Sequence, residues 1–252
     1  MLVMWSFLTA ITLIMIVAIV VTLKINDSFV PVPDPETGQT IPVDIYVNNL
    51  VQQVIGDMVF GSMGYVLIVV FVLMNSSKIV ASEVEKGTLV NLLTTNLNRK
   101  SVILSKMSTF ISLIFISILS QYLITIISLQ IVNQLQYVDL GIFTLKAFGA
   151  FLLLLFTSGF AFLFSTLFNR NSQALGLSGA IVIISWVFQI ASSFRTLDWM
   201  KYLSLNSLFI PANITNISEF SNYLGQYLTL GIGSIDLYIG AYFIFIKKDL
   251  PL

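Results

Sequence analysis

The chain carries six long apolar stretches separated by short polar connections, and this feature limits its possible folds more than any other. A helix that crosses a bilayer needs ~20 mostly apolar residues, because the hydrocarbon core is ~30 Å thick and each helical residue rises ~1.5 Å. Helices are expected because every backbone polar group must find its partner within the segment once water is excluded. The stretches are residues 2–23, 58–74, 107–132, 142–168, 173–194 and 226–246. The sequence therefore predicts an all-α integral membrane protein with six transmembrane helices.

Composition agrees with a membrane location and excludes much catalytic chemistry. Of the 252 residues, 57% are hydrophobic and 10% are charged, whereas a soluble domain has roughly 25% charged residues. Cysteine and histidine are both absent, which excludes disulfides, thiol nucleophiles and imidazole acid-base or metal chemistry. Residues 2–23 lack a basic start and a cleavage site of small residues, so they are interpreted as a retained span and not as a signal peptide. No repeat or second domain is visible, and residues 1–252 are interpreted as one transmembrane domain.

Basic residues in the connections predict that both termini are cytoplasmic, because cytoplasmic connections carry an excess of Lys and Arg. On that side lie Lys78, Lys86, Arg99, Lys100, Lys106, Arg170, Lys247 and Lys248. The connections of the opposite side hold Lys24, Lys146, Arg195 and Lys201. The expected topology is therefore N-in and C-in.

One dense polar cluster, SEVEKGTLVNLL at residues 82–93, lies in the first inner connection. Residues 76–86 have the propensity to extend the second span, and Gly87 suits the left-handed position that ends a helix. Thr88 can cap a new short helix. That helix would present Leu89, Leu92, Leu93 and Leu97 on one face. A solvated charge run that merely joins two spans is the alternative interpretation, but it does not account for an apolar face that a membrane or a partner must cover. Asn98 or Ser101 can cap the third span.

At these residues the chain resembles the membrane subunits of bacterial ABC-2 type ATP-binding-cassette exporters. The resemblance lies in Glu83-x-Glu85-x-Gly87-Thr88-Leu89, in Leu92-Leu93-Thr94, in Asn98-Arg99 and Ser105-Lys106, and in the ending IKKDLPL. Asn96 stands where the family often has a proline. Family members also carry a basic amphipathic helix before the first span; either that helix is missing here or the true start lies upstream.

The resemblance implies that a coupling helix between spans 2 and 3 docks on a separate ATPase subunit. Glu83 and Glu85 would orient the bend, Gly87 and Thr88 would form it, Leu89, Leu92 and Leu93 would supply the apolar contact, and Arg99 would anchor the return into the membrane. It further implies two ATPase copies, a second copy of this permease or a related one, and the bacterial cell membrane as the location. No cofactor would be bound directly, because ATP and magnesium would belong to the ATPase; a G-x-x-x-x-G-K-[ST] motif does not occur in the chain.

Inside the spans the sequence marks two candidate substrate-path residues. Asp236 lies near the middle of the last span, where an ionised carboxylate is costly unless it faces water or a partner. A re-entrant hairpin at residues 216–227, or a deeper entry of the helix, would instead place it near the outer surface. Gln121 belongs to an amide-rich half of the third span. Gly176 and Ala180 form a small-xxx-small pair that predicts close helix packing on the fifth span.

The predicted function is that of a permease subunit, not an enzyme, in an ATP-driven exporter of an amphipathic or hydrophobic peptide or drug. An intramembrane enzyme would need paired ionisable groups or metal ligands, which the spans do not offer. A membrane immunity or sensor protein that binds an extracellular peptide without pumping is the alternative. The choice between a homodimer and a heterodimer of permeases stays open.

Overall fold

The computed structural model describes residues 17, 56–61, 63–88, 98–131, 133, 135–216 and 220–248. Six α-helices lie in this part of the chain: α3 (Met63–Ile79), α4 (Ala81–Glu85), α6 (Arg99–Ile131), α7 (Leu140–Leu167), α8 (Asn171–Ser192) and α9 (Phe220–Lys247). Short 3-10 helices occupy Leu135–Tyr137 (η2), Arg195–Leu203 (η3), Asn206–Leu208 (η4) and Pro211–Asn213 (η5). No strand occurs among the described residues, so the all-α fold class is confirmed for them.

Five helical segments of the described chain are long and apolar enough to cross a membrane: Gly56–Glu85, Arg99–Ile131, Leu140–Leu167, Asn171–Ser192 and Phe220–Lys247. They correspond to the last five predicted spans. The predicted first span, residues 2–23, lies outside the described residues apart from Val17, which is helical. The protein is therefore a multi-pass membrane protein.

The helices extend beyond the predicted apolar stretches because polar residues continue them. α6 begins at Arg99, eight residues before the predicted start at 107, and the Lys100 N–H donates to the Asn98 side chain at 3.2 Å, which confirms Asn98 as a cap. α9 begins at Phe220, six residues before the predicted start at 226. A hydropathy pattern marks the length that lipid covers, whereas the hydrogen-bonded helix continues until a cap or breaker ends it.

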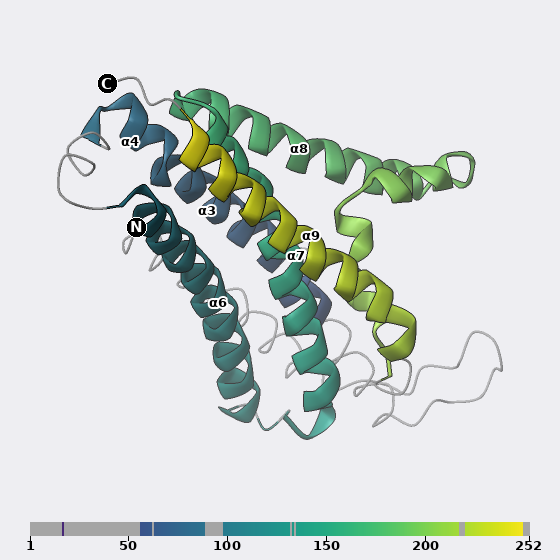
Figure 1. The fold of residues 1–252 in the computed structure, drawn as a ribbon. Helices are drawn as coiled ribbons and strands as arrows, with labels where there is room; N and C mark the ends of the chain where they lie inside the picture. The colour runs from purple at the N-terminus through teal and green to yellow at the C-terminus, as the bar shows by residue number, and fades with distance from the viewer. Residues whose placement is uncertain are drawn as a thin grey trace, which may run out of the picture.

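Helix α7 is the centre of the bundle and packs against α3, α6, α8 and α9 (Figure 1). In its membrane-spanning window 61% of the residues are buried, against 22% for α8. Two glycines allow α7 and α9 to approach closely. A Cβ at Gly159 would lie 2.9 Å from Leu237 Cβ, and a Cβ at Gly233 would lie 2.6 Å from Phe156 Cε2. Small residues at helix contacts are typical of membrane bundles.

The small-residue contact on α8 lies on a different face from the predicted one. A Cβ at Gly176 would meet no atom within 4 Å, so the predicted packing role of Gly176 with Ala180 is wrong for the described structure. The buried face carries Ala174, Ser178, Val182 and Ser185. Gly176 lies two residues from Ala174, a rotation of about 200° around the helix, and it therefore points away from the bundle.

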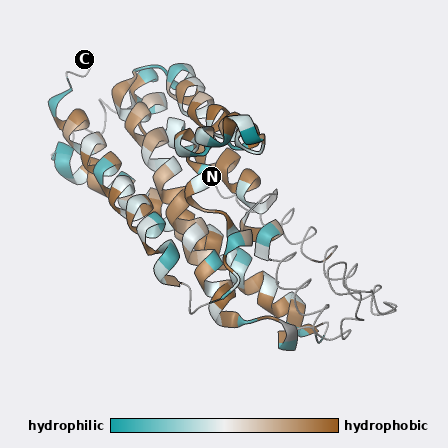
Figure 2. Ribbon diagram, turned by 90° about the vertical axis from the view of Figure 1, so that its right-hand side faces the viewer, coloured by the Kyte–Doolittle hydropathy of each residue, from teal (hydrophilic) through white to brown (hydrophobic). Residues whose placement is uncertain are grey.

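Apolar residues run along most of the length of the described helices, as the hydrophobic colouring in Figure 2 shows. Large exposed apolar side chains occur on α3, α6, α7, α8 and α9, and they are most numerous on α6, α8 and α9. Examples are Leu104, Phe115, Leu119 and Leu123 on α6, Ile183, Ile184 and Val187 on α8, and Leu228, Ile232, Ile239 and Phe243 on α9. A soluble monomer rarely exposes so much apolar surface. Lipid or a partner subunit is expected to cover most of this surface.

Candidate functional site

One end of the bundle gathers the polar cluster and four helix termini. Here α4 meets the beginnings of α6 and α8 and the ends of α7 and α9, at the upper left of Figure 1. We call this region the charged end. It holds Lys78, Glu83, Glu85, Lys86, Arg99, Lys106, Arg170, Lys247 and Lys248. Residues from two separate connections and from the C-terminal tail thus gather at one end of the bundle.

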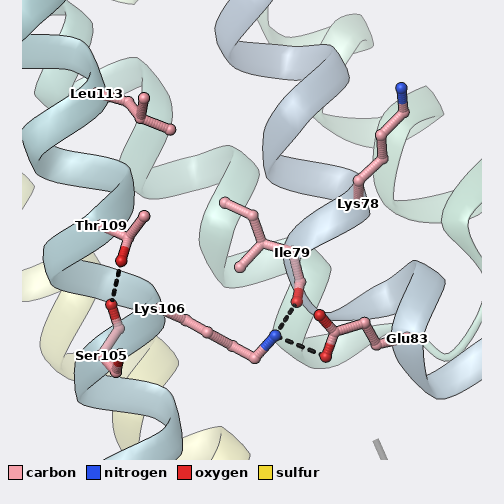
Figure 3. Close-up of a pocket in the computed structure, with 7 residues that line it drawn as sticks. All are labelled: Lys78, Ile79, Glu83, Ser105, Lys106, Thr109 and Leu113. Carbon is pink, nitrogen blue, oxygen red and sulfur yellow. Dashed lines mark hydrogen bonds and ion pairs between the residues drawn. The ribbon is translucent and has the colours of Figure 1, made fainter. Parts of the chain in front are cut away.

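Glu83 links α4 to α6 through Lys106. The Lys106 Nζ lies 2.6 Å from Glu83 Oε2 and donates to the Ile79 carbonyl at 2.7 Å. Ile79 is the last residue of α3, so the ammonium group also satisfies a free carbonyl at that helix end. Figure 3 shows Lys106 reaching from α6 across a cavity of about 200 Å³ to both oxygens. The ion pair ties the end of α3, the short helix α4 and the beginning of α6 together.

Glu85 links α4 to α8. Its Oε2 accepts a hydrogen bond from the Asn171 backbone N–H at 2.8 Å, and Asn171 is the first residue of α8. A carboxylate is favourable at this position because the first N–H groups of a helix are unpaired and carry partial positive charge. On the other side of α4, the Ala81 N–H donates to the Ser165 hydroxyl of α7 at 3.1 Å. α4 therefore touches three membrane helices.

The ends of α7 and α9 are joined by Lys248. Its Nζ donates to the carbonyls of Thr166 and Leu167 at 2.8 and 2.9 Å, where α7 ends. Burial at this helix end lowers the pKa of Lys248. Arg99 donates from its guanidinium to the Lys248 carbonyl at 3.3 Å. This contact lies just past the end of α9, and the anchoring role of Arg99 stays a prediction.

Gly87 ends the α4 segment in the predicted conformation. Its φ is +71°, and Lys86 precedes it as the C-terminal cap of α4. A residue with a side chain would be strained at this φ. The Thr88 hydroxyl donates back to the Glu83 carbonyl at 3.3 Å. Leu89, Leu92 and Leu93 lie outside the described residues, and the apolar face of the coupling helix stays a prediction.

The two candidate path residues do not share a surface. Asp236 is exposed midway along α9. Because α9 is continuous from Phe220, the hairpin alternative is wrong for residues 220–227. Gln121 on α6 is 2% exposed, and its Oε1 and Nε2 have no hydrogen-bond partner among the described residues. A buried amide without partners is costly, so this position suits a water or a polar ligand group.

Sequence reasoning missed several partners of the charged end. Ser165, Thr166 and Asn171 were not singled out, because a hydroxyl or a backbone N–H at a helix end has no distinctive pattern. Lys106 and Lys248 were recognised only as basic residues at the membrane boundary. Their spacing gave no indication that one would pair with Glu83 and the other with the end of α7.

A family model described as ABC-2 family transporter protein matches residues 1–233. This match includes the polar cluster at residues 82–93 and the whole of four of the five described spans. It ends within α9. No curated protein matches the chain.

Proposed function

Because the chain belongs to the ABC-2 family of transporter proteins, we propose that it is the membrane subunit of an exporter driven by a separate ATPase. Proteins of this family are transmembrane components, generally not catalytic, and usually work with an ATPase subunit. The proposed cargo is an amphipathic or hydrophobic molecule, a peptide or a drug, that moves outward. Such a cargo fits helices whose described spans contain few charges.

The observation that carries this proposal is the convergence of helix ends on α4. Glu83 bonds to α6, Glu85 bonds to the start of α8, and the Ala81 N–H bonds to α7. A displacement of α4 would therefore pull on three membrane helices at once. The left-handed Gly87 at its end lets the chain change direction without strain.

The proposed coupling element comprises Glu83, Glu85, Gly87, Thr88, Leu89, Leu92, Leu93 and Arg99. The three leucines would dock into an apolar groove of the ATPase, and the polar residues would transmit the movement through the contacts above. The complete exporter would contain two ATPase copies, which bind ATP and magnesium, and a second permease copy or a related permease. Both termini would lie in the cytoplasm of a bacterial cell.

A copurification experiment tests the docking role. The full-length chain is coexpressed with its ATPase subunit, and the variant carrying Leu92→Ser and Leu93→Ser is compared with wild type. We expect the double variant to reach the membrane at normal levels but to lose most of the bound ATPase, because two apolar contacts are removed. Leu203→Ser is the matched control, since Leu203 is exposed in η3 at the other end of α8. Full ATPase binding by the double variant would refute the docking role.

A further inference from the structure

Asp236 lies about midway along α9, far from both ends of the helix. Asp236 is eleven positions from Lys247 and sixteen positions from Phe220, the two ends of α9. At ~1.5 Å per residue these separations are about 16 Å and about 24 Å along the helix axis. With a hydrocarbon core ~30 Å thick and Lys247 at its inner boundary, the carboxylate lies near the midplane. Its short side chain spans only a small part of either distance.

The Asp236 side chain points away from the rest of the described chain. The buried residues of α9 are Tyr227, Leu230, Ser234, Tyr238, Ala241 and Phe245. Asp236 lies two residues from both Ser234 and Tyr238, which places it about 200° from each around the helix. The exposure of Asp236 agrees with this position. The carboxylate therefore lies on the outward face of α9.

The outward face of α9 carries a line of polar side chains flanked by exposed apolar ones such as Leu228 and Ile232. Asn222, Thr229, Asp236 and Phe243 recur every seven residues, and all four are exposed. Seven residues are nearly two helical turns, so the four side chains lie almost in line. A polar track thus runs from the outer end of α9 to the Asp236 carboxylate, and Phe243 continues the line about 10 Å deeper. We call this line the α9 track.

The described structure supplies no cation for Asp236. Its three ion pairs join Lys106 to Glu83, Lys146 to Asp57 and Lys201 to Asp198. The predicted first span, residues 2–23, contains no charged residue and could offer only neutral donors. Lipid tails have no hydrogen-bond donors for a carboxylate, so placing an ionised carboxylate among them near the midplane costs several kcal/mol. A positive charge from outside the described part of the chain, accompanied by water, would satisfy the carboxylate.

We propose that the α9 track lines a path open to water from the outer side and that Asp236 binds the cationic group of an amphipathic cargo molecule. The side-chain oxygens of Thr229 and Asn222 would contact the cation and its water as it moves outward. Phe243, with the exposed Ile232 and Ile239 beside the track, would hold the apolar body of the cargo. The inference deepens the proposed transport function by assigning a cargo charge, and it depends on that function only for the direction of movement.

A binding measurement tests the charge preference. The full-length chain, with any ATPase subunit that copurifies, is placed in nanodiscs without ATP, and binding of tetraphenylphosphonium is measured against empty nanodiscs. Triphenylphosphine oxide, a neutral molecule of similar shape, serves as competitor. We expect saturable binding of the cation, poor competition by the neutral compound, and at least a tenfold loss of affinity in Asp236→Asn. Asp236→Glu should stay within about threefold of wild type.

Two further variants keep the test decisive. Asp198→Asn removes an exposed carboxylate from η3 and should leave binding unchanged. Thr229→Lys places a cation on the track while Asp236 is retained, and it should weaken binding at least tenfold, whereas Thr229→Ser should not. Equal affinity in wild type and Asp236→Asn would overturn the proposal, and so would equal competition by the neutral compound. Separation of a permease dimer into monomers by Asp236→Asn would also overturn it, because Asp236 would then serve a subunit contact.

These outcomes are independent of the docking test. If the ATPase fails to copurify, the ATP-driven function fails, but cation binding can still be measured on the full-length chain. If the ATPase copurifies and the cation does not bind, only the assignment of cargo charge fails.

Discussion

The ion pair between Lys146 and Asp57 offers the sharpest test of how this bundle is held together. Lys146 lies in α7 with its side chain 2% exposed, and its Nζ is 3.1 Å from Asp57 Oδ1. The Asp57 side chain is 29% exposed and lies at the beginning of the Gly56–Glu85 span. The pair therefore joins the second predicted span to the central helix α7. Lys146 is buried, whereas Asp57 is partly exposed.

The difference in burial predicts unequal costs for removing the two partners. Removing one member of a buried pair costs about 3–5 kcal/mol when it leaves the other charge unpaired. Asp57→Asn leaves the buried Lys146 ammonium without its partner, and partial exposure of the site favours the lower end, about 3 kcal/mol. Lys146→Met leaves the carboxylate near water and fills the space with apolar atoms, so about 1 kcal/mol is expected. The double variant should resemble Lys146→Met.

Thermal unfolding of the purified protein in detergent measures these costs. A chain of this size loses about 2–4 °C of Tm per kcal/mol, which gives a decrease of about 6–12 °C for Asp57→Asn and about 2–4 °C for Lys146→Met. The double-mutant cycle should show a coupling of about 2 kcal/mol or more. Two results would refute the reasoning: equal losses in the single variants, or losses that simply add in the double variant.

Two further predictions concern a close helix contact and the charged end. A Cβ at Gly149 would lie 2.1 Å from Phe209 Cε2 and 2.7 Å from the Tyr227 hydroxyl, so Gly149→Ala should destabilise the protein by about 1–3 kcal/mol. A Cβ at Gly176 would meet no atom within 4 Å, so the control Gly176→Ala should be neutral or stabilise the protein by up to about 1 kcal/mol. Similar Tm values for the two variants would contradict the packing argument. Glu85→Ala should reduce stability by about 1 kcal/mol or less, because the lost hydrogen bond to the first residue of α8 is solvent-exposed. The same variant should keep ATPase binding but lower the ATPase activity that cargo stimulates. Unchanged stimulation would show that Glu85 takes no part in coupling.

Local signals in the sequence predicted the helical segments and their turn chemistry. Apolar length alone predicted the five spans that the structure describes, since a bilayer-crossing segment has to be a helix. Gly87 and Asn98 were predicted correctly because each acts on the backbone beside it, one through a positive φ and the other through a side-chain cap. The segment from 76 to 85 continues the second span with an irregular residue at Val80.

The sequence could not determine which face of each helix is buried. Lipid tails and the interior of a bundle are both apolar, so the hydrophobic periodicity that orients a helix in a soluble protein is weak here. The error at Gly176 has this cause, and so does the failure to recognise α7 as the central helix. The outward orientation of Asp236 also depended on the packing of Ser234 and Tyr238 against the bundle.

The sequence by itself determined that this chain crosses the membrane repeatedly. It also determined that a helix in the charged connection ends at Gly87. Those properties follow from local physics, namely the solvation of the backbone and the conformational freedom of glycine. Only the tertiary structure decided that Glu83 meets Lys106, that Glu85 caps α8 and that Lys248 caps α7. Such contacts join residues distant in the chain, and a charge selects its partner by proximity in space, which the order of residues does not encode directly.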